Sequence, residues 1–155
     1  MASSNCSPNQ CILAIDDESV FLGFLKSALE SQGYAVLTAS SQQEAIQIYE
    51  ERWREIDVVL LDYLLPPTLG DFVFDELQRL NPDVRVVLLT GFEEPVADKL
   101  FQKGLWAYLR KPFSLTDLAR KVEDAISRPA SCAPASRMKT WRSWSSPCAR
   151  RIGSV

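Results

Sequence analysis

Short apolar runs alternate with amphipathic segments along residues 11–128, and this alternation constrains the fold more than any other feature of the sequence. The runs are continuously apolar, as expected of β-strands that are covered on both faces. Predicted strands cover residues 11–15, 34–38, 57–61, 84–89 and 105–109. Since a helical segment follows each strand, we predict an α/β fold, a doubly wound five-stranded parallel sheet with helices on both faces.

Helical periodicity and capping signals mark the segments between the strands. Gly33 is well placed to stop the first helix. Ser40 or Ser41 can cap the second helix, and Glu44 stands three residues after Ser41 in the capping-box arrangement. Predicted helices cover residues 19–31, 41–54, 69–80 and 93–103, and a last helix is marked by Leu115, Leu118, Val122 and Ile126.

The charge of the chain is divided between a body and a tail. The 155 residues include 17 basic and 20 acidic side chains and no histidine, for a net charge of −3. Residues 1–128 (12 basic, 20 acidic) have a net charge of −8, and residues 129–155 (5 basic, none acidic) have a net charge of +5. The acidic body argues against nucleic-acid binding there. The missing histidine excludes Ser-His-Asp and Cys-His triads, histidine-containing zinc sites and a phosphohistidine within the chain itself.

We expect one folded domain over residues 10–128, between a disordered N-terminus (1–9) and a basic Ser/Pro/Arg-rich tail (129–155). The composition of the tail predicts disorder. Trp141 and Trp144 leave open that the tail docks on a partner or an anionic surface. It is also open whether the tail is the remnant of a longer protein or a stretch read out of frame.

The ends of the chain and its cysteines indicate a cytoplasmic protein. The first ten residues lack the basic and apolar segments of a signal peptide, and no apolar run is long enough to cross a bilayer. Cys11 opens an apolar run, so we expect a buried free thiol there rather than a disulfide.

Polar side chains stand where the predicted strands end. Asp16, Asp17 and Glu18 follow the first strand, Asp62 the third, Thr90 the fourth, and Arg110, Lys111 and Pro112 the fifth. Parallel strands bring such ends to one edge of the sheet, where ligands bind. The first loop is acidic rather than glycine-rich, which disfavours a dinucleotide phosphate. Converging carboxylates instead predict a hard divalent cation, most simply Mg²⁺.

These residues also suit phosphoryl chemistry. With a cation neutralising the cluster, one carboxylate can attack phosphorus, while Lys111 supplies a mobile positive charge and Thr90 a hydroxyl donor. Taken singly, each has an ordinary structural explanation: acids at a helix N-terminus, a turn residue, a cap or a solvated charge. Their occurrence together at successive strand ends favours a common site.

The sequence resembles the receiver domain of bacterial two-component response regulators over residues 10–128. The resemblance rests on Asp16-Asp17, on Asp62 followed by Pro66 and Gly70, on Thr90-Gly91, and on the segment from Tyr108 through Lys111-Pro112 to Phe113. It implies a flavodoxin-like fold and a phosphoryl group that Asp62 accepts from a partner sensor histidine kinase or phosphotransfer protein. It implies no enzyme beyond self-catalysed phosphoryl transfer and aspartyl-phosphate hydrolysis.

The resemblance also assigns roles to the neighbouring residues. It implies that Asp17 and Asp62 bind Mg²⁺ directly or nearly so, with the backbone carbonyl of Leu64, and that Asp16 helps through water. Thr90 and Lys111 are implied to contact the phosphoryl group. On activation Thr90 moves towards that group and Tyr108 turns inward behind it. The switched surface, here about residues 93–128, is the face expected for protein contacts and for a homodimer.

Two apolar residues depart from the polar surroundings of such a site, namely Leu64 and Phe92. They are either harmless variation or a means to limit attacking water and lengthen the phosphoryl lifetime. Trp106 is either exposed as a partner contact or packed in the core. A phosphatase or mutase with an aspartyl-phosphate intermediate is disfavoured, because Leu64 stands where those enzymes place a second acid. A scaffold that is never phosphorylated usually loses an acid, Thr or Lys, and none is lost here.

Overall fold

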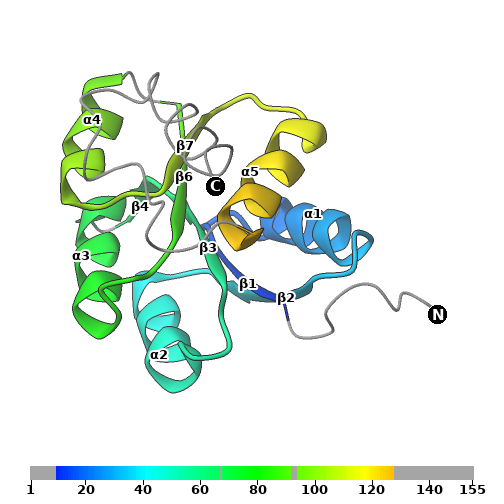
Figure 1. Ribbon diagram of the computed structural model, residues 1–155, viewed down its shortest axis with the longest axis horizontal. Coiled ribbons are helices and arrows are strands. Elements are labelled where there is room, and N and C mark those ends of the chain that lie inside the picture. The colour runs from blue at the N-terminus through cyan, green and yellow to red at the C-terminus, as the bar shows by residue number, and fades with distance from the viewer. Residues whose placement is uncertain (1–9, 67, 92–93, 128–155) are drawn as a thin grey trace, which may run out of the picture. The chain divides into compact units, whose positions relative to one another are not determined.

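The computed structural model describes residues 10–66, 68–91 and 94–127. Its main sheet has the strand order β2-β1-β3-β6-β7, and a second sheet consists of β4 and β5 (Figure 1). The predicted five-stranded α/β fold is thereby confirmed. Residues up to Val86 form one compact unit and residues from Val87 a second, and they are described in turn.

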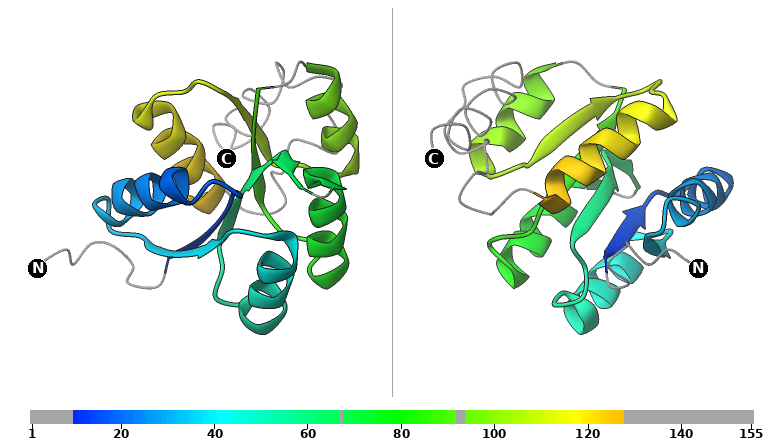
Figure 2. Two further views of the ribbon diagram at one scale, coloured as in Figure 1. Left: turned by 180° about the vertical axis from the view of Figure 1, so that it is seen from behind. Right: turned by 45° about the vertical axis from the view of Figure 1, so that its right-hand side comes forward.

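The first unit is built on three parallel strands, β1 (Cys11–Ile15), β2 (Ala35–Ala39) and β3 (Val58–Asp62). Every residue of β1 and β3 is buried, because helices cover both sides of these strands. Figure 2 shows α1 (Ser19–Glu30) on one side and α2 (Gln42–Arg52) and α3 (Gly70–Leu80) on the other. Cys11 is a buried free thiol, as predicted.

Local signals explain where the helices of this unit begin and end. The Ser41 side chain caps α2, since its Oγ accepts a hydrogen bond from the Glu44 backbone N–H at 3.1 Å. The backbone N–H of Ser40 donates to the Glu44 carboxylate at 2.8 Å, so the two hydrogen bonds of the expected capping box involve two different serines. Gly33 follows α1 with a φ of 101°, in the left-handed region that favours glycine.

The second unit contains two parallel strands, β6 (Val86–Thr90) and β7 (Ala107–Arg110). α4 (Glu94–Lys103) and α5 (Leu115–Ser127) lie on opposite sides of this pair (Figure 2). The buried face of α5 consists of Leu118, Val122 and Ala125, whereas Leu115 is 45% exposed. The helix predicted from Leu115, Leu118, Val122 and Ile126 is confirmed, and Leu115 is its first residue.

Several predicted strands begin one or two residues too early. Val84 and Leu105 are buried, yet both precede the paired segments β6 and β7. Apolar residues just before a strand can be buried without taking part in strand pairing. A strand predicted from hydrophobicity therefore starts earlier than the hydrogen-bonded segment. Trp106 is 2% exposed, which decides between its two alternatives in favour of packing.

A short antiparallel hairpin follows β3 and was not predicted. It consists of β4 (Leu64–Leu65) and β5 (Thr68–Leu69), with Leu64 opposite Leu69. Strands of two residues are too short to produce a periodic signal in the sequence. The predictions for the termini and for Phe92 lie outside the described residues. None of the helices within the described ranges is long and apolar enough to span a membrane.

Candidate metal and phosphoryl site

Three aspartates converge at the carboxyl ends of β1 and β3. The two strands are in parallel register, with Ile15 opposite Leu61, so the residues that follow, Asp16 and Asp62, emerge at the same edge. One carboxylate oxygen from each of Asp16, Asp17 and Asp62 lies within 4.8 Å of the others. Asp16 and Asp62 are 2% and 6% exposed, and Asp17 is exposed to solvent.

The backbone around α1 fixes the orientation of Asp16. Its Oδ1 accepts a hydrogen bond from the Glu18 backbone N–H at 2.9 Å, and its own N–H donates to the carbonyl of Ala39 at 3.1 Å. The carboxylate is therefore held at the start of the helix, with its Oδ2 also buried. A buried, oriented carboxylate offers an oxygen at a defined position towards its two neighbours.

The donor set suits Mg²⁺. Three carboxylates in so small a space repel one another, and a cation among them removes that repulsion. Mg²⁺ prefers oxygen ligands and retains several waters when only a few carboxylates bind it. The exposed position of Asp17 leaves room for such waters. The residues present thus fit the ion that the acidic strand ends predicted.

The loop after Asp62 brings Gly70 back beside Tyr63. The backbone N–H of Gly70 donates to the carbonyl of Tyr63 at 2.6 Å, which closes the segment that contains the β4–β5 hairpin. The side chain of Gln42, on α2, holds the hairpin from behind, because its Nε2 donates to the carbonyl of Leu65 at 2.8 Å in a buried bond. Leu64 is 52% exposed, two residues beyond Asp62.

The second unit carries the remaining predicted residues at the ends of its own strands. Thr90 is the last residue of β6 and is 1% exposed, and the backbone N–H of Lys111 donates to its carbonyl at 2.8 Å. Tyr108 lies within β7 and is 7% exposed. The peptide bond between Lys111 and Pro112 is cis. The structure therefore groups the three aspartates in the first unit and joins Thr90 to Lys111 in the second.

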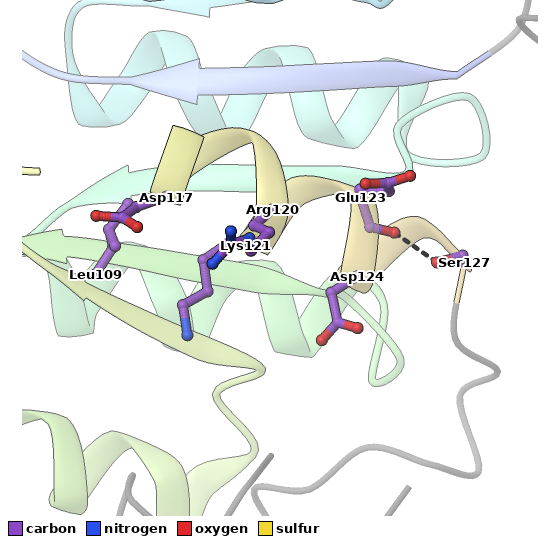
Figure 3. Close-up of a pocket in the computed structure, with 7 residues that line it drawn as sticks. All are labelled: Leu109, Asp117, Arg120, Lys121, Glu123, Asp124 and Ser127. Atoms are coloured by element: carbon purple, nitrogen blue, oxygen red, sulfur yellow. Dashed lines mark hydrogen bonds between the residues drawn. The ribbon is translucent and has the colours of Figure 1, made fainter. Parts of the chain in front are cut away.

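A hollow of about 440 Å³ between residues of α5 and Leu109 of β7 was not predicted (Figure 3). Its lining is strongly charged and includes Leu109, Asp117, Arg120, Lys121, Glu123 and Asp124. Burial lowers the pKa of Lys121, and the carboxylates of Asp124 and Asp117 partly offset that effect. The spacing of opposite charges along residues 117–124 was the available sequence signal, but such spacing is equally typical of a solvated helix face.

Comparison with known proteins agrees with this arrangement. The family model of the response regulator receiver domain matches residues 12–123. The chain is 33% identical over 128 residues to the sensor kinase CckA of Brucella abortus, a match that covers 81% of this chain and 13% of that protein. It is 34% identical over 133 residues to the alkaline phosphatase synthesis transcriptional regulatory protein PhoP of Bacillus subtilis, covering 84% of this chain and 54% of that protein.

Both of these relatives are therefore much longer than the matched region. Among solved structures, a response regulator receiver domain protein from Clostridium thermocellum is 38% identical, with a TM-score of 0.72 over 76% of this chain and 94% of that one. One from Methanospirillum hungatei is 27% identical, with a TM-score of 0.69 over 76% and 93%. With a matching family model, a matching fold and acids at the expected strand ends, the chain belongs to the response regulator receiver domain family.

Proposed function

We propose that Asp62 is the residue that receives the phosphoryl group in two-component signalling. The observation that carries this proposal is the position of Asp62: it ends β3, is 6% exposed, and has the carboxylates of Asp16 and Asp17 within 4.8 Å. An oxygen of Asp62 attacks phosphorus and forms a P–O bond. The P–N bond to the donor imidazole breaks, and the imidazole leaves with the bonding electron pair.

Asp17, Asp62 and the backbone carbonyl of Leu64 are the proposed ligands of Mg²⁺, with Asp16 acting through water. When bound, the ion neutralises charge on the carboxylates and on the phosphoryl oxygens. The bond from Glu18 to Asp16 keeps that carboxylate oriented without a contribution from the ion.

Thr90 and Lys111 are proposed to contact the phosphoryl oxygens, through a hydroxyl donor and an ammonium charge. Their backbones are hydrogen-bonded to each other, so the two side chains start from fixed positions. Thr90 moves towards the phosphoryl group on activation, and Tyr108 turns inward behind it. The transfer and the later hydrolysis of the aspartyl phosphate are self-catalysed by these residues and the bound ion.

The proposed donor is a sensor histidine kinase or a phosphotransfer protein, since the chain has no histidine of its own. The proposed output is a protein contact over the face around residues 93–128, including a homodimer. The charged lining of the hollow on α5 supports a protein contact there, because alternating charges suit a complementary polar surface better than a small apolar ligand.

The test of the phosphoacceptor is covalent modification of the purified chain. With Mg²⁺ and acetyl phosphate we expect the intact mass to rise by one phosphoryl group in wild type and in Asp75→Asn, an exposed acid of α3 outside the cluster. Asp62→Asn should remain unmodified. Modification of Asp62→Asn at the wild-type rate would place the acceptor elsewhere, and no modification of wild type by acetyl phosphate or beryllofluoride would favour a scaffold.

The output face has a separate test. Sedimentation velocity with Mg²⁺ and beryllofluoride should show an increased dimer fraction in wild type, and Arg120→Glu, in the hollow of α5, should reduce it. A variant that dimerises as well as wild type would exclude this part of the face.

A further inference from the structure

Gly70 makes an unusually close backbone contact with the residue proposed to carry the phosphoryl group. A Cβ atom built on Gly70 would lie 3.0 Å from the carbonyl oxygen of Asp62, 3.0 Å from the Cα of Tyr63 and 3.3 Å from the Tyr63 carbonyl oxygen. All three neighbours are backbone atoms at the end of β3, so no side chain can rotate away to make space. A methyl group at position 70 would therefore press directly on this main chain.

The same residue fixes which carbonyl of the loop remains available. Because the Gly70 N–H bonds to the carbonyl of Tyr63, that oxygen is already used. In an antiparallel pair, hydrogen-bonded and non-hydrogen-bonded positions alternate. The next opposed pair, Leu64 and Leu69, is therefore the non-hydrogen-bonded one, and the carbonyl of Leu64 points away from β5. The contact at Gly70 selects the Leu64 carbonyl as the one free of the hairpin.

We infer that Gly70 is a positioning residue for the metal site. Its N–H fixes the peptide between Tyr63 and Leu64, and its missing side chain lets α3 begin directly against the main chain of Asp62. The inference rests on the proposed function, since it takes Asp62 and the Leu64 carbonyl as ligands of Mg²⁺. It adds a residue that touches neither the ion nor the phosphoryl group.

The size of the expected effect follows from the distances. An alanine at this position requires the neighbouring backbone to give by a few tenths of an ångström. Mg²⁺ demands ligand distances of about 2.0–2.1 Å in near-octahedral geometry, so a shift of that size matters. Loss of a residue that orients metal ligands typically weakens metal affinity by about 10–100-fold. We therefore expect Gly70→Ala to weaken Mg²⁺ binding by about tenfold.

Two matched variants separate positioning from general effects in a calorimetric Mg²⁺ titration. Gly23→Ala adds the same methyl group on α1, where nothing lies within 4 Å of the new Cβ, and should bind Mg²⁺ like wild type. Leu77→Ala removes a fully buried side chain later in α3 and should lower the melting temperature while leaving Mg²⁺ affinity nearly unchanged. Equal affinity in Gly70→Ala and wild type would overturn the inference while leaving the proposed function intact.

A measurement on wild type decides the matter if Gly70→Ala does not fold. In NMR spectra of the labelled protein, the Gly70 amide should be protected from hydrogen exchange. Added Mg²⁺ should shift the ¹³C carbonyl signal of Leu64 more than that of Tyr63. A rapidly exchanging Gly70 amide, or a larger shift at Tyr63, would overturn the inference. A wild-type protein that binds neither Mg²⁺ nor beryllofluoride would instead overturn the proposed function.

Discussion

The backbone N–H of Lys111 donates a 2.8 Å hydrogen bond to the backbone carbonyl of Thr90. This bond continues the parallel register of β6 and β7, in which Thr90 lies opposite Arg110. Thr90 and Lys111, which are 21 positions apart in the chain, thus leave the sheet side by side. Their relative placement is set by strand pairing, so it does not depend on a flexible loop.

Replacing Asp62 by asparagine should stabilise the metal-free protein. The change removes the charge of one of three mutually repelling carboxylates, of which Asp16 and Asp62 are buried. We expect the free energy of unfolding to rise by on the order of 1 kcal/mol. Thermal melts in a chelator should therefore show a higher melting temperature for Asp62→Asn than for wild type. Saturating Mg²⁺ should raise the melting temperature of wild type and have little effect on the variant.

Asp75→Asn is the control for this comparison and should respond to Mg²⁺ as wild type does. A chelator melt in which Asp62→Asn is the less stable protein would speak against repulsion within the cluster.

Leu64→Asn should shorten the lifetime of the aspartyl phosphate. Leu64 is 52% exposed two residues beyond Asp62, and we expect its apolar side chain to limit the approach of water. The measurement is the rate at which phosphorylated protein loses its phosphoryl group after the donor has been removed. Leu69→Asn, at the opposite position of the hairpin, controls for added surface polarity. Equal rates in wild type and Leu64→Asn would exclude the shielding role.

Gln42→Met should destabilise the protein through the hairpin. The variant keeps the side-chain size but removes the donor to the buried carbonyl of Leu65, a loss expected to cost about 1–3 kcal/mol. Urea unfolding should show this difference in the free energy of unfolding. Gln43→Met, exposed at the next position, should change the free energy by less than about 0.5 kcal/mol. Similar losses in the two variants would mean that the bond contributes nothing specific.

Tyr49 should make the protein less stable at alkaline pH. Burial raises the pKa of Tyr49 above the usual 10, and the hydrogen bond from Asn81 opposes this only in part. Above pH 10 the unfolded chain loses this proton before the folded one does, so the free energy of unfolding falls as pH rises through that window. Below it, the contribution is constant.

Tyr49→Phe should reduce this alkaline slope and lower stability at neutral pH by about 1 kcal/mol, since the bond to Asn81 is lost. Urea unfolding at neutral and at alkaline pH measures both quantities. An alkaline slope equal to that of wild type would show that Tyr49 does not titrate in this way.

The sequence was sufficient for the elements that have a repeating pattern. The strand over residues 11–15 was predicted with its observed bounds, because a run such as Cys11 to Ile15 is buried throughout. The grouping of Asp16, Asp17 and Asp62 followed from the rule that parallel strands end at one edge. Contacts between backbone atoms could not be predicted from the sequence. The close approach of Gly70 to Asp62 and the hairpin at Leu64 depend on how the chain turns after β3, and residue type does not encode that path.

Because Cys11 is buried in β1, its reaction with a thiol reagent can report local opening of that strand. Burial raises the pKa of the Cys11 thiol, and its backbone N–H donates to the carboxylate of Asp57 at 2.8 Å, so the first residue of the strand is tied down. While β1 is paired with its neighbours, very little of the Cys11 thiol is present as the thiolate that reacts with a thiol reagent. The rate of modification of this sulfur, located by peptide mass, would therefore measure how often β1 separates from its neighbours β2 and β3. Cys11, at the amino end of β1, thus reports local opening at the edge of the sheet opposite to the carboxyl ends where Asp16 and Asp62 lie.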